Sequence, residues 1–203
     1  MFQIVANGDV PDATYFNGLM RQSVIPVTST TRPSSPVDGM TIYETDHDLI
    51  RTWNGSSWQI TGGARTYARK TGDETVANSA TLQDDDQLFL PVVAGAVYEM
   101  RLRVYFVSPP TPDIKFGWGY PAGAKLWWTA IDAQTGTTLG KLTETDVAAV
   151  VTIGPTWQTQ TFEGVVIVGG TSGTLNFRWA QNGANASNTI VQEGSMLMLE
   201  RVA

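Results

Sequence analysis

The sequence predicts a mainly β protein: a short N-terminal helix and a small β-meander, followed by an antiparallel, jelly-roll-like β-sandwich. Apolar and polar side chains alternate along several segments, most clearly over residues 98–106, as expected for strands with one buried face. The 20 glycines and 10 prolines are spread along the chain, which is typical of the many turns of an all-β protein. No alternation of strands with helical segments is visible, which argues against a parallel sheet.

Residues 1–31 are expected to form a helix-containing attachment segment. Asp12 can cap a helix, and Pro26 is expected to end it. Between them, apolar side chains recur at three- and four-residue spacings. A helix of this length is marginally stable alone in water, so its apolar stripe must dock on the same chain, a sister subunit or a larger assembly. The stripe consists of Tyr15, Phe16, Leu19 and Met20, and Val24 can extend it.

Residues 32–64 are expected to form a linker and a small three-stranded meander. The prolines within residues 32–38 keep that stretch extended. Asn54-Gly55 is a strong hairpin signal, and Gly62-Gly63 is the expected hinge to the next domain. Three strands this short rarely hold together alone, so the meander is expected to pack against neighbours. The expected strands are Met40–Glu44, Leu49–Trp53 and Trp58–Thr61.

Residues 65–203 are expected to form the sandwich domain, because strand-like segments alternate there with segments rich in Gly, Pro, Asn or Thr. The last strand, residues 195–202, has large apolar groups on both faces. Such a strand must be covered on both sides, so either it lies centrally or one face meets another subunit. The other expected strands are Thr66–Lys70, Gln87–Val92, 98–106, Ile114–Trp118, Leu126–Ile131, Val147–Ile153, Thr159–Val168 and Leu175–Ala180.

The composition excludes several classes of function. The chain has no cysteine, which excludes disulfides and cysteine-based metal sites. Acidic residues outnumber basic ones by 19 to 13 without any basic stripe, which argues against nucleic acid as a partner. No apolar run approaches the length of a membrane span, and residues 1–12 lack the pattern of a secretory signal. We therefore expect a protein made in a cytoplasm and not inserted in a membrane.

Two motifs in residues 32–58 indicate a family resemblance. An Arg32-Pro33-Ser34-Ser35-Pro36 linker leads to a hairpin with Tyr43-Glu44-Thr45-Asp46 and Trp53-Asn54-Gly55-Ser56-Ser57-Trp58. This arrangement resembles minor tail, fibre and other virion surface proteins of tailed bacteriophages, and segments near residues 81–91 and 179–182 are similar to the C-terminal domains of such proteins. The resemblance implies a location on the virion surface, other virion proteins as partners and frequent trimerisation. It implies no catalytic residue, cofactor or metal.

Four aromatic residues close together are candidates for a binding surface. Their rings could stack on the sugars of a host surface glycan, or could belong to the core or to a subunit interface. Trp127 and Trp128 are adjacent, so on a strand one ring is expected to point inward and the other outward. The four candidates are Trp118, Tyr120, Trp127 and Trp128.

The sequence offers no convincing catalytic or metal site. His47 is the one histidine, and we expect it in a solvated hairpin turn, which makes a Ser/His/Asp triad improbable. Asp84-Asp85-Asp86 could attract Ca²⁺ but lacks the spacing of an EF-hand loop, so we expect a charged turn before the strand at Leu88. No pair among Glu99, Asp113, Asp132, Glu163 and Glu193 can be assigned to glycoside hydrolysis.

These observations favour a non-enzymatic structural component of a tailed-phage virion. The N-terminal region would attach the chain to the particle, and the sandwich would be displayed as a homotrimer. Two placements stay open: a minor tail or short fibre protein, and a capsid decoration or head-fibre protein. The alternative function is a carbohydrate-binding module for host recognition.

Overall fold

A computed structural model describes residues 24–63, 65–132, 140–150, 152 and 154–203. The chain divides into two compact units, residues 1–64 and 65–203. All regular secondary structure in the described residues is strand, and the sheets are predominantly antiparallel, which confirms the prediction of a mainly β protein. No helix in this part of the chain has the length and apolar character that a membrane crossing requires.

The helix predicted within residues 1–31 falls on residues 1–23, which lie outside the described part of the chain. Its stripe residues therefore stay a prediction: Tyr15, Phe16, Leu19 and Met20. Val24 is exposed, and the three residues after it form strand β1 (Ile25–Val27). Pro26, which was expected to end a helix, lies inside this strand. Proline is tolerated there because β1 is an edge strand.

The first unit contains the predicted meander, extended by β1. Strands β2 (Thr41–Glu44), β3 (Leu49–Trp53) and β4 (Trp58–Gly63) follow one another in antiparallel pairing, and β1 adds in parallel beside β2. The expected hinge glycines are the last two residues of β4, where Gly62 pairs with Ile50. The boundary between the units thus falls just after the glycines rather than on them.

The residues of the family-like hairpin hold this small sheet together. Trp53 and Trp58 are cross-strand partners whose rings meet edge to face, with 5.5 Å between centroids. The Asn54 side chain accepts hydrogen bonds from the backbone N–H groups of Ser56 and Ser57 at 3.0 and 2.9 Å. Gly55 adopts a φ of +90°, which side chains rarely allow. The motif therefore encodes a turn and its packing.

A buried carboxylate ties the linker to the meander. Glu44 is 0% exposed and accepts a hydrogen bond from Arg51 Nε at 2.9 Å and another from Arg32 Nε in the linker. The His47 ring nitrogen Nδ1 lies 3.3 Å from the same carboxylate. Burial alone would raise the pKa of Glu44, but these hydrogen bonds outweigh it and hold the pKa below its ordinary value.

We predict that the first unit loses stability in acid through Glu44. Because the pKa of Glu44 is depressed in the folded state, its stabilisation is present above the unfolded pKa and is lost as pH falls through the folded pKa. Unfolding followed through the NMR signals of Trp53 and Trp58 should show this loss. Glu44→Gln should be less stable at neutral pH, and its free energy of unfolding should change less with pH across the acid range. Identical pH slopes for the two proteins would contradict the assignment.

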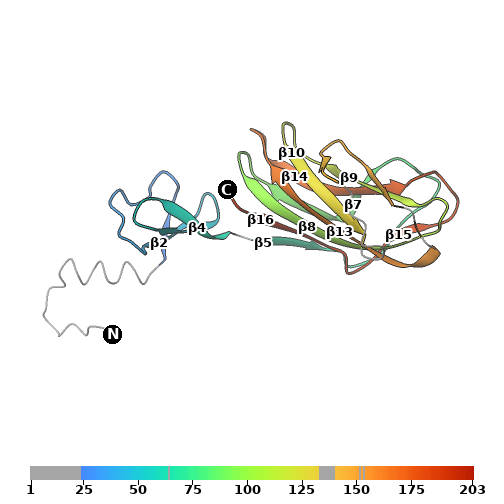
Figure 1. Cartoon of the computed structure of the whole chain (residues 1–203), viewed down its shortest axis with the longest axis horizontal. Helices are drawn as coiled ribbons and strands as arrows, with labels where there is room; N and C mark the ends of the chain where they lie inside the picture. The colour runs from blue at the N-terminus through green and yellow to red at the C-terminus, as the bar shows by residue number, and fades with distance from the viewer. Residues whose placement is uncertain (1–23, 64, 133–139, 151, 153) are drawn as a thin grey trace, which may run out of the picture. The chain divides into compact units, whose positions relative to one another are not determined.

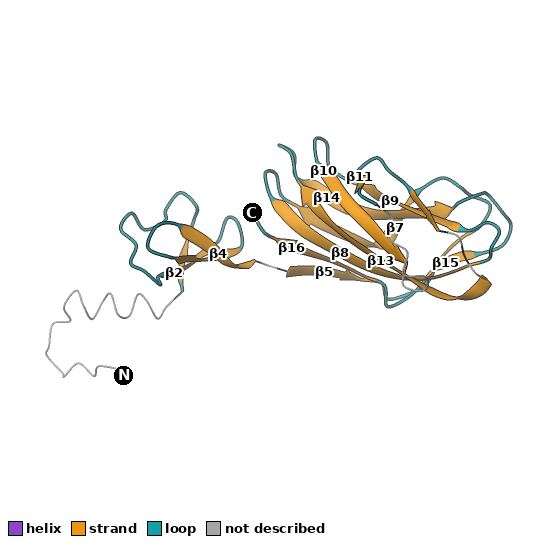
Figure 2. Ribbon diagram, in the orientation of Figure 1, coloured by secondary structure: helices purple, strands orange, loops and turns teal. Residues whose placement is uncertain are grey.

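The second unit, residues 65–203, is built from two sheets (Figures 1 and 2). In the large sheet, β8 is central: it pairs with β13 on one side and with β16 and β15 on the other. The large sheet contains β5 (Arg65–Arg69), β6 (Glu74–Val76), β8 (Val97–Ser108), β10 (Lys125–Asp132), β11 (Leu142–Thr143), β13 (Gly154–Ile167), β15 (Thr189–Val191) and β16 (Met196–Arg201). The small sheet contains β7 (Gln83–Val92), β9 (Ile114–Gly119), β12 (Ala148–Val150) and β14 (Gly173–Gln181).

One apolar core lies between the two sheets. Alternate residues of β8 point into it, from Tyr98 to Phe106, as the alternation in the sequence predicts. Phe162 of the large sheet contacts the rings of Phe116 and Phe177 of the small sheet at centroid distances of 5.2 and 5.8 Å. Such aromatic pairs add to the stabilisation that comes from burying their area.

All nine strands predicted for residues 65–203 have an observed counterpart. The segment predicted at residues 147–153 is shorter, since β12 covers Ala148–Val150. Three short strands were missed: β6, β11 and β15. Each has only two or three residues, too few for an alternation to be recognised.

We predict that Phe162→Ala destabilises the second unit by about 3–5 kcal/mol, because it removes a fully buried ring and leaves a cavity. Chemical denaturation followed by circular dichroism measures the change. Phe89→Ala is the matched control, since Phe89 is 47% exposed on β7. Its cost should be about 0.5 kcal/mol. Equal costs for the two substitutions would contradict the assignment of the core.

Candidate functional site

Two of the four aromatic candidates belong to the core. Trp118 and Trp128 are only 5% and 2% exposed, and their rings meet edge to face at a centroid distance of 6.2 Å. Trp128 Nε1 donates a hydrogen bond to the carbonyl oxygen of Thr143 at 2.8 Å, which satisfies its polar atom inside the protein. Neither ring offers a face on which a sugar could stack.

The other two candidates lie at the surface. Trp127 is 40% exposed on the outer face of β10, so the prediction that adjacent tryptophans point to opposite sides is confirmed. Its ring carries the ammonium of Lys141, with Nζ 4.6 Å from the centroid. Tyr120, just after β9, is half-buried against the edge of the core. The structure thus places two of the four rings in the core and two at the surface instead of joining all four in one platform.

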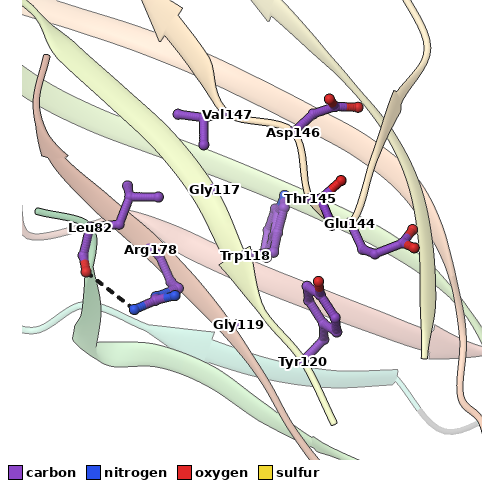
Figure 3. Close-up of a pocket in the computed structure, with 10 residues that line it drawn as sticks. All are labelled: Leu82, Gly117, Trp118, Gly119, Tyr120, Glu144, Thr145, Asp146, Val147 and Arg178. Carbon is purple, nitrogen blue, oxygen red and sulfur yellow. Dashed lines mark hydrogen bonds between the residues drawn. The ribbon is translucent and has the colours of Figure 1, made fainter. Parts of the chain in front are cut away.

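A hollow of about 380 Å³ opens on the second unit next to Tyr120 (Figure 3). Two glycines of β9 contribute to its lining, where larger side chains would intrude. A Cβ on Gly117 would come within 3.1 Å of Leu82 Cδ1, and one on Gly119 within 3.3 Å of an Asp84 oxygen. The lining is completed by Trp118, Glu144, Thr145, Asp146, Val147 and Arg178.

Charged side chains around this hollow are held by hydrogen bonds and an ion pair. Arg178 Nη2 donates to the carbonyl oxygen of Leu82 at 3.2 Å, as Figure 3 shows, and its Nε lies 2.8 Å from Asp84 Oδ1 without being aligned for a hydrogen bond. Asp146 accepts bonds from the N–H and hydroxyl of Thr143 at 2.6 and 2.8 Å. The Thr143 N–H is the main reason why the pKa of Asp146 is lowered. The hollow therefore combines an aromatic edge with ordered polar groups.

The outer face of the large sheet is the second candidate surface. Strand β16 lies between β8 and β5 in the large sheet, a position that covers only one of its two faces. Its inner residues Leu197 and Leu199 are fully buried. On the outer face, Met196 is 42% exposed, and Tyr67 on the neighbouring strand is 53% exposed. The second apolar face of β16 is thus left uncovered in the single chain.

The rest of this outer face mixes apolar side chains with paired charges. Trp127 and Val165 are register partners and are 40% and 38% exposed. Between them and β16, Arg101 pairs with Glu99 at 2.6 Å. Exposed aromatic and aliphatic groups thus lie among charged side chains on this face.

The expected charged turn at Asp84-Asp85-Asp86 is wrong. These residues lie inside β7, at a place where its pairing with β14 shifts register. The irregularity turns Asp85 into the interior, whereas Asp84 and Asp86 are exposed. The three carboxylates therefore diverge. Among the described residues, no group of three or more histidines and acidic side chains could hold a metal ion.

The carboxylates considered for hydrolysis do not line a cavity together. Glu99 and Glu163 both lie on the open outer face of the large sheet, on either side of Arg101. Asp113 accepts hydrogen bonds from the backbone and hydroxyl of Thr152 at 2.8 and 3.0 Å. Structural contacts thus account for Asp113 and Glu99.

Sequence reasoning missed the importance of Lys70, Glu74 and Arg178. Lys70 and Glu74 flank the short polar turn between β5 and β6, where side chains are usually exposed, yet Lys70 is only 1% exposed. No signal in the sequence distinguishes a buried lysine from the solvated lysines of an ordinary turn. Arg178 alternates with buried Phe177 and Trp179 in β14, so its outward direction could have been predicted.

No protein-family model matches the chain, and no curated protein matches it. Among solved structures, Eiger TNF from S. frugiperda is similar at 10% identity and a TM-score of 0.37, over 70% of this chain and 94% of that one. Infectious bursal disease virus Gx strain is similar at 10% identity and a TM-score of 0.21, over 84% of this chain and 49% of that one. At such scores neither likeness bears on the function proposed below.

Proposed function

We propose that this protein is a structural, non-enzymatic component of a tailed-phage virion. Its N-terminal region attaches it to the particle, and residues 65–203 are displayed on the surface as a homotrimer. The single observation on which the proposal depends is the uncovered outer face of the large sheet. There, Met196 on β16 and Tyr67 on the neighbouring strand β5 are both exposed. The phage-like linker and hairpin motifs at residues 32–58 supply the virion context.

The proposed fold of the displayed unit is a jelly roll. The strand order supports it: β7 pairs with β14, which pairs with β9, while β16 pairs with β8, which pairs with β13. Strands early in the unit therefore lie beside strands from its end, as in a doubly wound antiparallel sandwich. This architecture occurs in viral capsid and lectin domains, but fold alone does not assign function.

Self-association is the proposed way of covering the exposed face. In a closed trimer each interface joins two different surfaces of the subunit, so this patch would be buried against a second surface of the neighbouring copy in every subunit. Four of the charges on this face are paired within the chain: Arg65 Nε lies 2.7 Å from Glu200 Oε2, next to the pairing of Arg101 with Glu99. Burying paired charges at an interface costs less free energy of desolvation than burying isolated ones.

The virion proposal is tested by quantitative proteomics of the purified particle of the phage that encodes the chain. Hundreds of copies per particle would indicate a capsid decoration or head-fibre protein, and a few to a few dozen would indicate a minor tail or short fibre protein. Absence from purified particles would contradict the proposal.

We predict that Tyr67→Asp combined with Met196→Asp dissociates the assembly. Both side chains are exposed in the single chain, so the fold should survive while charge is placed in the proposed interface. Sedimentation velocity should show a smaller species. The matched control is Phe89→Asp with Val147→Asp, two residues each 47% exposed away from the large sheet. If both double variants sediment alike, the outer face of the large sheet is not the interface.

A second candidate function is glycan binding at the hollow beside Tyr120. The specific observation is an aromatic edge next to the fixed polar groups of Glu144 and Arg178, in a space that β9 leaves open at Gly119. Sugars are bound by such combinations of a ring and directional hydrogen bonds.

We predict that glycan-array binding, where it occurs, is lost in Gly119→Val, because the added side chain would occupy the hollow and crowd Arg178. Arg178→Met should weaken the same binding by removing donors. Trp127→Ala is the control, since Trp127 lies outside this hollow. Binding that is lost only in Trp127→Ala would place the glycan at β10 instead.

A further inference from the structure

A lysine and two carboxylates meet in the interior of the second unit. Lys70 follows β5 of the large sheet, Glu74 begins β6, and Asp85 lies on β7 of the small sheet. The side chains of Lys70, Asp85 and Glu74 are 1%, 0% and 11% exposed. Lysine is almost never buried to this degree unless it is paired, and here one amine is shared by two carboxylates.

The geometry brings the amine onto the carboxyl group. Lys70 Nζ lies 3.0 and 2.9 Å from the two oxygens of Asp85. Because it is nearly equidistant from both, it also lies within about 3.5 Å of the carbon between them, so a near-attack conformation requires a change in its direction of approach rather than in its distance. Glu74 Oε2 lies 2.6 Å from the same nitrogen, so it is placed to accept or return a proton.

The surroundings fix Asp85 and polarise it. Its Oδ1 accepts hydrogen bonds from the backbone N–H groups of Gln87 and Leu88 at 3.0 and 2.9 Å. Its Oδ2 accepts one from Trp179 Nε1 at 3.1 Å, inside the core. Donors fixed in this way around a carbonyl group stabilise the negative charge that develops on its oxygen when a nucleophile adds.

Glu74 is held in place by two further contacts. Its Oε1 accepts a hydrogen bond from Gln83 Nε2 at 2.7 Å, and its Oε2 accepts one from the N–H of Asp86 at 3.1 Å. The β7 irregularity presents Asp85 to Lys70 and the Asp86 N–H to Glu74. Bulges of this kind often re-aim side chains next to reactive sites.

We propose that Lys70 and Asp85 condense to an intramolecular isopeptide bond, with Glu74 as the proton relay. A proton passes from the Lys70 ammonium to the Asp85 carboxylate, directly or through Glu74. The neutral Nζ then attacks the carbon of the carboxylic acid and forms a C–N bond. Glu74 takes a proton from this nitrogen and gives it to a departing hydroxyl, so that the C–O bond breaks and one water molecule leaves. No oxidant, reductant or cofactor is consumed.

The bond would give this cysteine-free chain a covalent link between its two sheets. It closes a loop between residues 15 positions apart and removes two charges from the interior. Loop closure of this kind restricts the unfolded chain, as a disulfide does, but resists reducing conditions. The inference does not depend on a virion location, because it uses only contacts within residues 65–203.

The test is the intact mass of the purified full chain under denaturing conditions. The expected mass is lower than that of the sequence by one water molecule. Succinimide formation at Asp38-Gly39 would cause the same loss, so the position must be determined. Trypsin should then leave residues 70–101 as one looped peptide, uncut after Lys70 and without fragment ions from within residues 71–84. A folded protein at full mass after prolonged incubation at 37 °C would overturn the proposal.

Substitutions at Lys70 and Glu74 test whether the loss of water comes from the proposed bond. Lys70→Arg keeps the positive charge but cannot form the amide, so it should have the full mass. Glu74→Gln keeps a hydrogen-bonding side chain without a proton relay, and it should also have the full mass or lose water far more slowly. Lys125→Arg, at an exposed position of β10, is the control and should keep the water loss. A loss that persists in Lys70→Arg would overturn the assignment.

Discussion

The burial of one apolar face from each of two sheets is the constraint on which the rest of this structure depends. Alternate residues of β8 and β13 meet those of β9 and β14 in a core dominated by aromatic rings. Since each sheet covers only the inner face of the other, both outer faces are left to solvent or to partners. The outer face of the large sheet still has large apolar groups, notably at Tyr67 and Met196. These exposed groups are the physical basis for proposing that the protein belongs to an assembly.

The motifs of the first unit are explained by folding rather than by chemistry. Glu44 gathers Arg32 and Arg51 around a buried carboxylate, and Asn54 fixes the following turn. A sheet of four short strands buries little apolar area, so these hydrogen bonds supply part of the stabilisation that a larger core would otherwise give. The residues that carry the proposed resemblance thus serve the folding of this small unit. The resemblance says little about what the larger unit contacts, which must be argued from that unit's own surface.

Alternation made most of the large unit predictable, because an apolar side chain at every second position leaves few other arrangements. It gave the strands on both sides of the core and the outward direction of Trp127. It could not give the burial of Trp118, which depends on how the two sheets close, nor the place of Asp85. A run of aspartates looks like a solvated turn, and only the register shift against β14 turns one of them inward to Lys70. Contacts between distant strands are set by tertiary packing, which local pattern does not encode.

The most direct test of the central claim is the molar mass of the purified full chain, measured by size-exclusion chromatography with multi-angle light scattering. The chain has a mass of 22.0 kDa, and an assembly that covers the outer face of the large sheet should elute with the mass of three chains. A mass equal to one chain across the accessible concentration range would contradict the account, because the exposed apolar face would then be stable in water without a partner.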